Sequence, residues 1–273
     1  MSDNSHPAVG EVYVDFDGQQ LVVASDEPKV LDYIRSKYVH MVVPRNSEPI
    51  GKLSVRTTRD GYVVNGTKEL QHSDTIETLY DYLCHDIWQS FLQIRFDLLW
   101  LHAGAVEKNG CGVVIAGKSG NGKSTFVTQL LQRGWNVLSD EYAPIRLETN
   151  EVVPYPRRPR RRVFPGRELE EMEFGEFETE DIEIPADSVR RTPVVLANMV
   201  FPFFKVGATT QLEKLSPGDA VMEIIRNTTN FKHHRRLGIE WVVDFVKRVP
   251  CYRVTYADGA DAAEAVNTEL GGK

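Results

Sequence analysis

The segment from Gly117 to Ser124 has the residue types and the spacing needed to bind a phosphate. It reads GKSGNGKS and satisfies the pattern G-x-x-x-x-G-K-[ST] in full. Glycines permit a tight turn whose successive N–H groups point into one concavity and bind phosphate oxygens. Lys123 adds a positive charge for the β- and γ-phosphates, and the Ser124 hydroxyl is suited to Mg²⁺. The predicted nucleotide-binding residues are Gly117, Lys118, Ser119, Gly120, Asn121, Gly122, Lys123, Ser124 and Thr125.

The segments on either side of this loop supply the context that the motif requires. CGVVIA precedes it as an apolar strand, and STFVTQLLQRG follows it with apolar residues at helical spacing, ending near Gly134. A nucleotide-binding loop stands between a strand and a helix, whereas a glycine turn without a ligand has no such requirement. We therefore expect a bound nucleotide.

A histidine lies a short distance ahead of the loop. Asn109-Gly110 between two strand-like runs predicts a two-residue hairpin turn. In that register each opposed pair of residue numbers sums to 219, so His102 would face Gly117. A shift of one residue would move His102 to the other face of the sheet. We predict that His102 belongs to the phosphate site, the alternative being a hydrogen-bonded core histidine.

An acidic pair, Asp140-Glu141, ends the next predicted strand, WNVLSDEY. Strands that run in the same direction bring their C-terminal ends to one edge of a sheet, so the pair should meet the phosphate loop there. One carboxylate could hold Mg²⁺ together with Ser124, and the other could accept a proton from an attacking hydroxyl. Both can serve only if the strand ends at Asp140 and the chain turns. The alternative is a solvated strand end.

Two highly charged stretches follow. Residues 157–162 contain five arginines between prolines, and residues 168–183 contain nine acidic side chains. Arg157 and Arg158 are the candidate ligands for phosphoryl oxygens, since a guanidinium binds them in a bidentate manner. The acidic stretch is interpreted as a flap or a dock for a basic peptide; alternatively, both stretches form an exposed loop with weak ion pairs. Residues 232–236, KHHRR, are interpreted as a solvated surface.

The chain is expected to contain two domains. Residues 1–98 form a small β-rich lobe with a short helix near 30–37 and an amphipathic helix over 74–95, which Asp74 and Glu77 should begin as a capping box. We interpret the apolar face of that helix as part of the core, and a partner-binding groove is the alternative. Residues 99–273 form the α/β catalytic domain.

After the acidic pair, the second domain is expected to contain further strands and helices. Residues 149–193 are interpreted as irregular. VVLANMVFPFF, ATTQLEKL and CYRVTY are predicted strands, and helices are predicted over 217–226 and 238–248.

Composition limits the function classes. A net charge of −7 argues against a general nucleic-acid binder. Three cysteines without metal-ligand spacing suit reduced thiols. The sequence has no run of 18 apolar residues, so no membrane span is predicted. The first residues do not resemble a signal peptide. We therefore expect a cytoplasmic protein, and a homo-oligomer is compatible with these features.

Taken together, LHAGAV, GKSGNGKST and NVLSDE resemble the catalytic core of the HPr kinase/phosphorylase family, and more distantly that of phosphoenolpyruvate carboxykinase. The resemblance implies a P-loop kinase fold, ATP and Mg²⁺ as donor and cofactor, and transfer of phosphate to a hydroxyl. It places His102 as the active-site histidine and Asp140 and Glu141 as the acidic pair. The family has aspartate at both acidic positions, and its E-I-R-G-L-G-type signature has no counterpart here.

The chain is more similar to stand-alone HPr-kinase-related proteins, some of which resemble serine kinases that modify ribosomally made peptides. The expected acceptor is therefore a serine of a peptide or protein. A small-molecule hydroxyl is the first alternative. A nucleotide-binding regulator that transfers no phosphate is the second, and the intact acidic pair argues against it.

Overall fold

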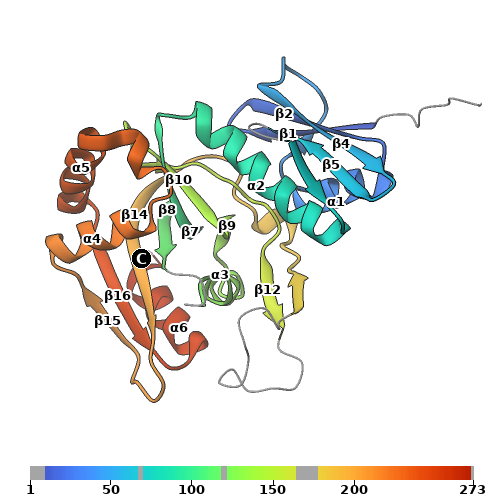
Figure 1. Ribbon diagram of the computed structural model, residues 1–273. Coiled ribbons are helices and arrows are strands. Elements are labelled where there is room, and N and C mark those ends of the chain that lie inside the picture. The colour runs from blue at the N-terminus through green and yellow to red at the C-terminus, as the bar shows by residue number, and fades with distance from the viewer. Residues whose placement is uncertain (1–9, 67–69, 118–121, 164–177, 272–273) are drawn as a thin grey trace, which may run out of the picture. The chain divides into compact units, whose positions relative to one another are not determined.

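The computed structural model describes residues 10–66, 70–117, 122–163 and 178–271, and it has a mixed α/β fold (Figure 1). The chain divides into two compact units, Met1–Phe96 and Asp97–Lys273. The division falls two residues before the boundary at residue 98 expected from the sequence. Among the helices described, none is long and apolar enough to cross a membrane.

The first unit is a six-stranded sheet carrying two helices, with strand order β3-β1-β2-β4-β5-β6. The alternating residues of EVYVDF bury one side of β1, whereas the continuous apolar run LVVAS belongs to β2, which is buried nearly throughout. The elements are β1 (Gly10–Phe16), β2 (Gln19–Ser25), α1 (Pro28–Lys37), β3 (Val42–Val43), β4 (Gly51–Thr58), β5 (Gly61–Asn65), β6 (Leu70–Ser73) and α2 (Ile76–Ile94).

The amphipathic helix α2 forms as predicted, but its N-terminal cap is not the expected one. Thr75, not Asp74, is the N-cap, and its hydroxyl accepts a hydrogen bond from the N–H of Thr78. The prediction was wrong by one residue because both side chains are good caps, and the capping residue is the one whose extended backbone aims its oxygen at the first turn.

The second unit is built on an eight-stranded sheet with the order β11-β10-β7-β8-β14-β16-β15, in which β9 also pairs with β7. Strands β8, β14 and β16 are parallel, while β7 runs against β8, β9 and β10. Its main strands are β7 (Leu98–Lys108), β8 (Cys111–Ala116), β9 (Asn136–Ser139), β10 (Tyr142–Arg146), β11 (Glu151–Val152), β14 (Val194–Phe204), β15 (Gln211–Lys214) and β16 (Cys251–Tyr256).

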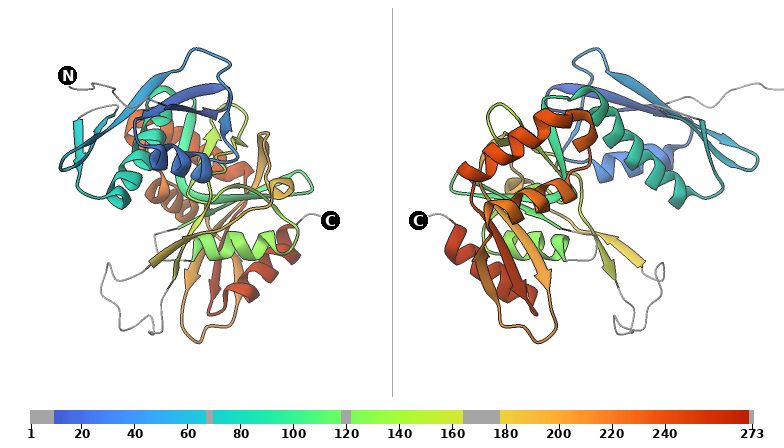
Figure 2. Two further views of the ribbon diagram at one scale, coloured as in Figure 1. Left: turned by 90° about the vertical axis from the view of Figure 1, so that its right-hand side faces the viewer. Right: turned by 60° about the vertical axis from the view of Figure 1, so that its left-hand side comes forward.

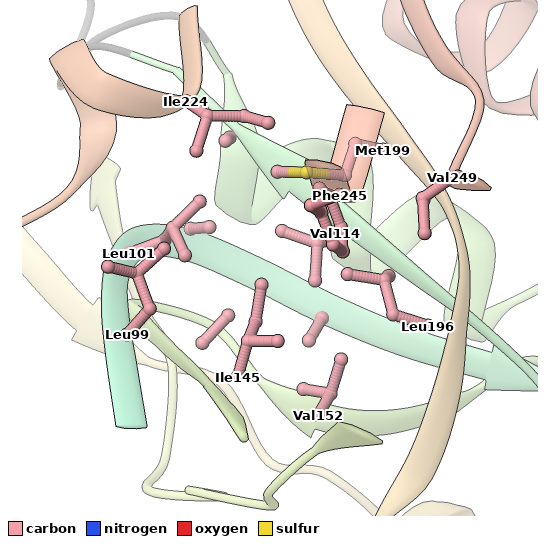
Figure 3. Close-up of a cluster of buried hydrophobic side chains, with 14 of the residues drawn as sticks. Leu99, Leu101, Val114, Ile145, Val152, Leu196, Met199, Ile224, Phe245 and Val249 are labelled. Carbon is pink, nitrogen blue, oxygen red and sulfur yellow. The ribbon is translucent and has the colours of Figure 1, made fainter. Parts of the chain in front are cut away.

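Helices cover both faces of this sheet and create two cores. On one face α3 (Lys123–Leu131) and α6 (Gly259–Leu270) lie together, as Figure 2 shows. On the other face α4 (Pro217–Asn227) and α5 (Phe231–Arg248) pack over a second core, whose side chains Figure 3 shows. Alternate residues of β7 and β8 enter opposite cores, so the continuous apolar runs of these strands reflect burial on both faces.

Several elements differ from the sequence-based expectation. Helix α5 starts at Phe231 rather than near 238, so the KHHRR run lies in its first turns. That run is not simply solvated, because His234 Nε2 lies 3.1 Å from the carbonyl of Leu98. Helix α6 was not expected, although Asp258 caps it. Within 149–193 the chain also forms β11, β12 (Arg160–Val163), β13 (Glu178–Asp181) and the short 3-10 helix Ala186–Ser188.

Candidate phosphate-binding and catalytic site

The hairpin ahead of the phosphate loop has the predicted register. Asn109 and Gly110 take the positive φ angles of 55° and 80° that the tight turn requires. The strands then pair without a bulge from Lys108↔Cys111 to Ala103↔Ala116. His102 and Gly117 follow directly on the last pair of this ladder, so the histidine comes to the end of β8, where the phosphate loop starts.

The phosphate loop is described at both of its ends. Gly122 has a φ of 70° and caps α3, which begins at Lys123. A Cβ at Gly122 would lie 2.7 Å from the Tyr256 hydroxyl, so both the backbone angle and the space favour glycine there. The predicted binding residues 118–121 lie outside the described residues. Strand, loop and helix therefore occur in the order that the motif requires.

Two residues at the start of α3 turn toward the other elements of the site. Lys123 is buried, with 7% of its surface exposed, and its Nζ donates a hydrogen bond of 2.6 Å to the Gly117 carbonyl. The Ser124 hydroxyl donates to Asp140 Oδ2 over 3.1 Å. The ammonium group is thus held at Gly117, where the loop begins, and the predicted pair of metal ligands is in contact.

The acidic pair lies at a bend between two strands that share one partner. β9 pairs with β7 at residues 105–107, and β10 pairs with β7 at residues 98–102. The condition under which both carboxylates can serve is met, because β9 ends at Ser139 and the chain bends at Asp140 and Glu141 before it resumes along β7. The carbonyl of Glu141 accepts a hydrogen bond of 3.0 Å from Ala103 N–H. The bend frees the two carboxylates from strict alternation.

Gly104 is a part of this site that the sequence reasoning missed. A Cβ on Gly104 would lie 2.5 Å from Cγ2 of Val127 and 3.7 Å from the carbonyl oxygen of Asp140. The missing side chain lets α3 pack directly on β7 and brings Ser124 within reach of Asp140. A glycine within an otherwise apolar strand is the signal that could have indicated such a close approach.

The two candidate arginines have different surroundings. Arg157 forms an ion pair with Glu141 and is largely buried. Its position follows from the preceding chain, because the Tyr155 N–H donates to the Leu138 carbonyl over 2.9 Å and so ties this segment to the end of β9. Arg158 instead lies 3.5 Å from the exposed Glu183. Of the two, the structure brings Arg157 to the acidic pair.

His102 completes the site as an uncharged imidazole. It lies on the same face of β7 as Gly104, toward α3, and pairs through its backbone with Tyr142 on β10. Burial, together with the positive charges of Lys123 and Arg157, lowers the pKa of His102 to about 4. A neutral imidazole can accept or donate a hydrogen bond without adding to the positive charge of the site.

The donor set fits a magnesium ion. Ser124 and Asp140 offer the hydroxyl and carboxylate oxygens that Mg²⁺ prefers, and their 3.1 Å contact places them side by side at the start of α3. Phosphate oxygens and water normally supply the other ligands of such an ion, so a set of two protein ligands suffices. These two residues could therefore hold Mg²⁺ against a phosphate bound in the loop.

A scan of protein-family models and a search of curated proteins find no match to the chain. Among solved structures, the chain is similar to one described as the HPr(Ser) kinase/phosphatase from Coxiella burnetii. The sequences are 13% identical, and the match covers 62% of this chain and 91% of that chain with a TM-score of 0.33. A likeness of that size does not support a conclusion about activity.

Proposed function

We propose that the protein is an ATP- and Mg²⁺-dependent kinase with a P-loop catalytic unit of the HPr-kinase type. The acceptor is a hydroxyl, and a serine of a peptide or protein is the preferred class. The observation that carries the proposal is the contact of Ser124 with Asp140, at the start of a helix that follows a phosphate-loop motif. Contact between a loop hydroxyl and the acid of the neighbouring strand is what phosphoryl transfer with a metal ion needs.

In the transfer step the acceptor oxygen forms a bond to the γ-phosphorus while the bond from that phosphorus to the β,γ-bridging oxygen breaks. ADP leaves with the electron pair of the broken bond. The proton of the acceptor hydroxyl goes to the carboxylate of Glu141, which lies next to the metal-binding Asp140. Lys123 neutralises charge that develops on the phosphoryl oxygens, and little further chemistry is required of the protein.

Arg157 has two roles in this scheme. Before the substrates bind, its ion pair with Glu141 holds both side chains in place. When the γ-phosphate arrives, the guanidinium binds its oxygens, and Glu141 is released to accept the proton of the acceptor. His102, neutral and on the same face of β7, orients the acceptor hydroxyl. Ser124 and Asp140 would hold Mg²⁺, which would neutralise charge on the donor phosphates.

The decisive experiment combines binding and transfer. The purified chain is incubated with Mg²⁺ and γ-labelled ATP against a serine-containing peptide library and a panel of small-molecule alcohols. Labelled phosphoserine supports the preferred acceptor, while label on a small molecule alone supports the first alternative. Asp140→Asn should lower transfer by about 10²–10⁴-fold, because the metal ion that Asp140 would hold contributes several kcal/mol of charge stabilisation in the transition state, and it should leave ATP binding largely intact. Full transfer by that variant would contradict the assignment.

A matched variant controls for the loss of one negative charge. Asp187 is exposed in the short 3-10 helix Ala186–Ser188, so Asp187→Asn should transfer phosphate at the wild-type rate. ATP binding without transfer to any acceptor in either panel would instead favour the nucleotide-binding regulator.

A further inference from the structure

Strands β14 and β16 continue beyond the end of β8 (Figure 1). Val200 on β14 pairs with Ile115, which is one residue before the end of β8. Phe204 therefore lies three residues, or about 10 Å, past the level of Ala116. Its partner on β16 is Tyr256. The two strand ends form a wall beyond the end of β8, and its Tyr256 hydroxyl lies close to Gly122.

Tyr256 joins this wall to the phosphate loop. It is buried, with 4% of its surface exposed, and it belongs to the core beneath α3 and α6. Its hydroxyl is the group that leaves room only for glycine at position 122. The phenol is uncharged at neutral pH and does not repel an anion, and burial raises the pKa of Tyr256 further.

Phe204 is the exposed part of the wall. Its ring centroid lies 5.8 Å from that of Tyr256, at an interplanar angle of 72°, and 50% of its surface is exposed. It shares a face of β14 with Val200, which packs in the core beneath α3 and α6. Phe203 is also 50% exposed but points to the opposite face of the sheet. Of these two phenylalanines, Phe204 is the one that offers its ring on the α3 side of the sheet.

The order of the strands gives a bound nucleotide its direction. The charged groups of the site, Asp140, Glu141 and Arg157, lie on or beside β9 and β10, on the β7 side of β8. A γ-phosphate bound to them lies on that side of the loop. The remainder of the nucleotide then leaves the loop on the other side of β8, where β14 and β16 end.

We propose that Phe204, supported edge-on by Tyr256, is the surface on which the base of the nucleotide donor stacks. The inference rests on the proposed nucleotide binding and adds a subsite to it. Every base has an aromatic face, so stacking of this kind contributes affinity without selecting one base. Phe204 is then a binding residue for the donor, and it takes no part in the transfer step.

The test distinguishes the contribution of the base to binding from that of the phosphates. Dissociation constants for ATP and for inorganic tripolyphosphate, both with Mg²⁺, are measured by calorimetry for the wild type, Phe204→Ala and Phe203→Ala. Phe204→Ala should weaken ATP binding about 5- to 150-fold, the range for one base stacked on an aromatic ring, and leave tripolyphosphate binding unchanged. Phe203→Ala should change neither constant, and Phe204→Trp should restore ATP binding.

Other outcomes overturn the subsite. Wild-type ATP affinity in Phe204→Ala would do so, as would an equal loss of ATP and tripolyphosphate binding, which indicates damage to the loop. If the wild type binds neither ligand, the proposed function fails and the subsite fails with it. If the wild type binds both ligands but transfers no phosphate, the kinase proposal alone fails, and the loss in Phe204→Ala still supports the subsite.

Discussion

The two sides of the phosphate loop carry different kinds of side chain. On the β7 side, polar and charged groups are held in contacts within the chain, such as Ser124 with Asp140 and Arg157 with Glu141. On the β14 and β16 side the loop meets aromatic rings, with Tyr256 against Gly122 and Phe204 beyond it. A fixed electrostatic environment is needed where charge is rearranged, whereas a sequence-tolerant surface suffices where a ligand is only held.

Among the variants that test this contrast, the largest effect is expected from the Lys123 charge, which lies between the two sides. Lys123→Met should lower phosphate transfer about 10²–10³-fold, because a buried positive charge at the loop is lost. It should also raise the pKa of His102, since the Lys123 charge contributes to lowering it. Transfer kinetics and an NMR titration of His102 measure the two effects. Lys247→Met, on the exposed surface of α5, is the control and should change neither quantity.

A second prediction tests which arginine belongs to the charged side. Arg157→Gln should lower the transfer rate about 10- to 100-fold, roughly the value of one hydrogen bond to a charged group. Arg158→Gln carries the same change one residue away, at a side chain near the exposed Glu183, and should keep the wild-type rate. Steady-state kinetics with saturating ATP measure both. Equal losses in the two variants would show that the arginine run acts only through its total charge.

Substitutions at two glycines, one on the β7 side and one against Tyr256, test the same contrast through stability and nucleotide binding. Gly104→Ala should lower the free energy of unfolding by about 1–3 kcal/mol, because the new methyl group overlaps Val127 in a packed core. Gly122→Ala should chiefly weaken nucleotide binding, since it strains the loop and displaces the Tyr256 hydroxyl. Urea denaturation and ATP titration distinguish the two effects. Gly218→Ala has open space around it and an ordinary φ angle, so it should preserve both properties.

The smallest effect concerns pH. The pKa of His102 is lowered from 6.5 to about 4 in the folded protein, so the unfolded chain binds its proton at a higher pH. The stability from the neutral imidazole is present above pH 6.5 and is lost as the pH falls toward 4. Urea denaturation at several pH values should therefore show a shallower acid loss in His102→Gln. Phe204→Ala, on the aromatic side, should keep the wild-type slope.

Local signals in the sequence predicted the hairpin and the helix caps with different success. The Asn109-Gly110 turn fixes the register of its strands by backbone geometry alone, so the pairing down to Ala103 could be predicted. The capping residue of α2 could not, since Asp74 and Thr75 are both suitable. Helix α6 has an Asp258 cap but buries mostly small side chains, so its apolar spacing is a weak signal.

The arrangement of the charged groups required the folded chain. Arg157 and Arg158 are neighbours of the same type, and only the tie between Tyr155 and Leu138 decides which of them reaches Glu141. Likewise, the acidic pair could be expected near the loop, but its bend depends on β9 and β10 sharing β7. Contacts between segments distant in the chain are not encoded in the spacing of neighbouring residues.

The parallel pairing of β8 with β14 has a consequence for how the chain is made. One edge of β8 is covered at once by its hairpin partner β7, but the other edge pairs with residues 196–200, about 80 residues further on. At ordinary rates of synthesis the ribosome adds that stretch in about 4–16 s. Throughout that interval an apolar strand edge is open to pairing with other chains. Chains truncated before Val194 should therefore aggregate, even though they carry the complete phosphate loop.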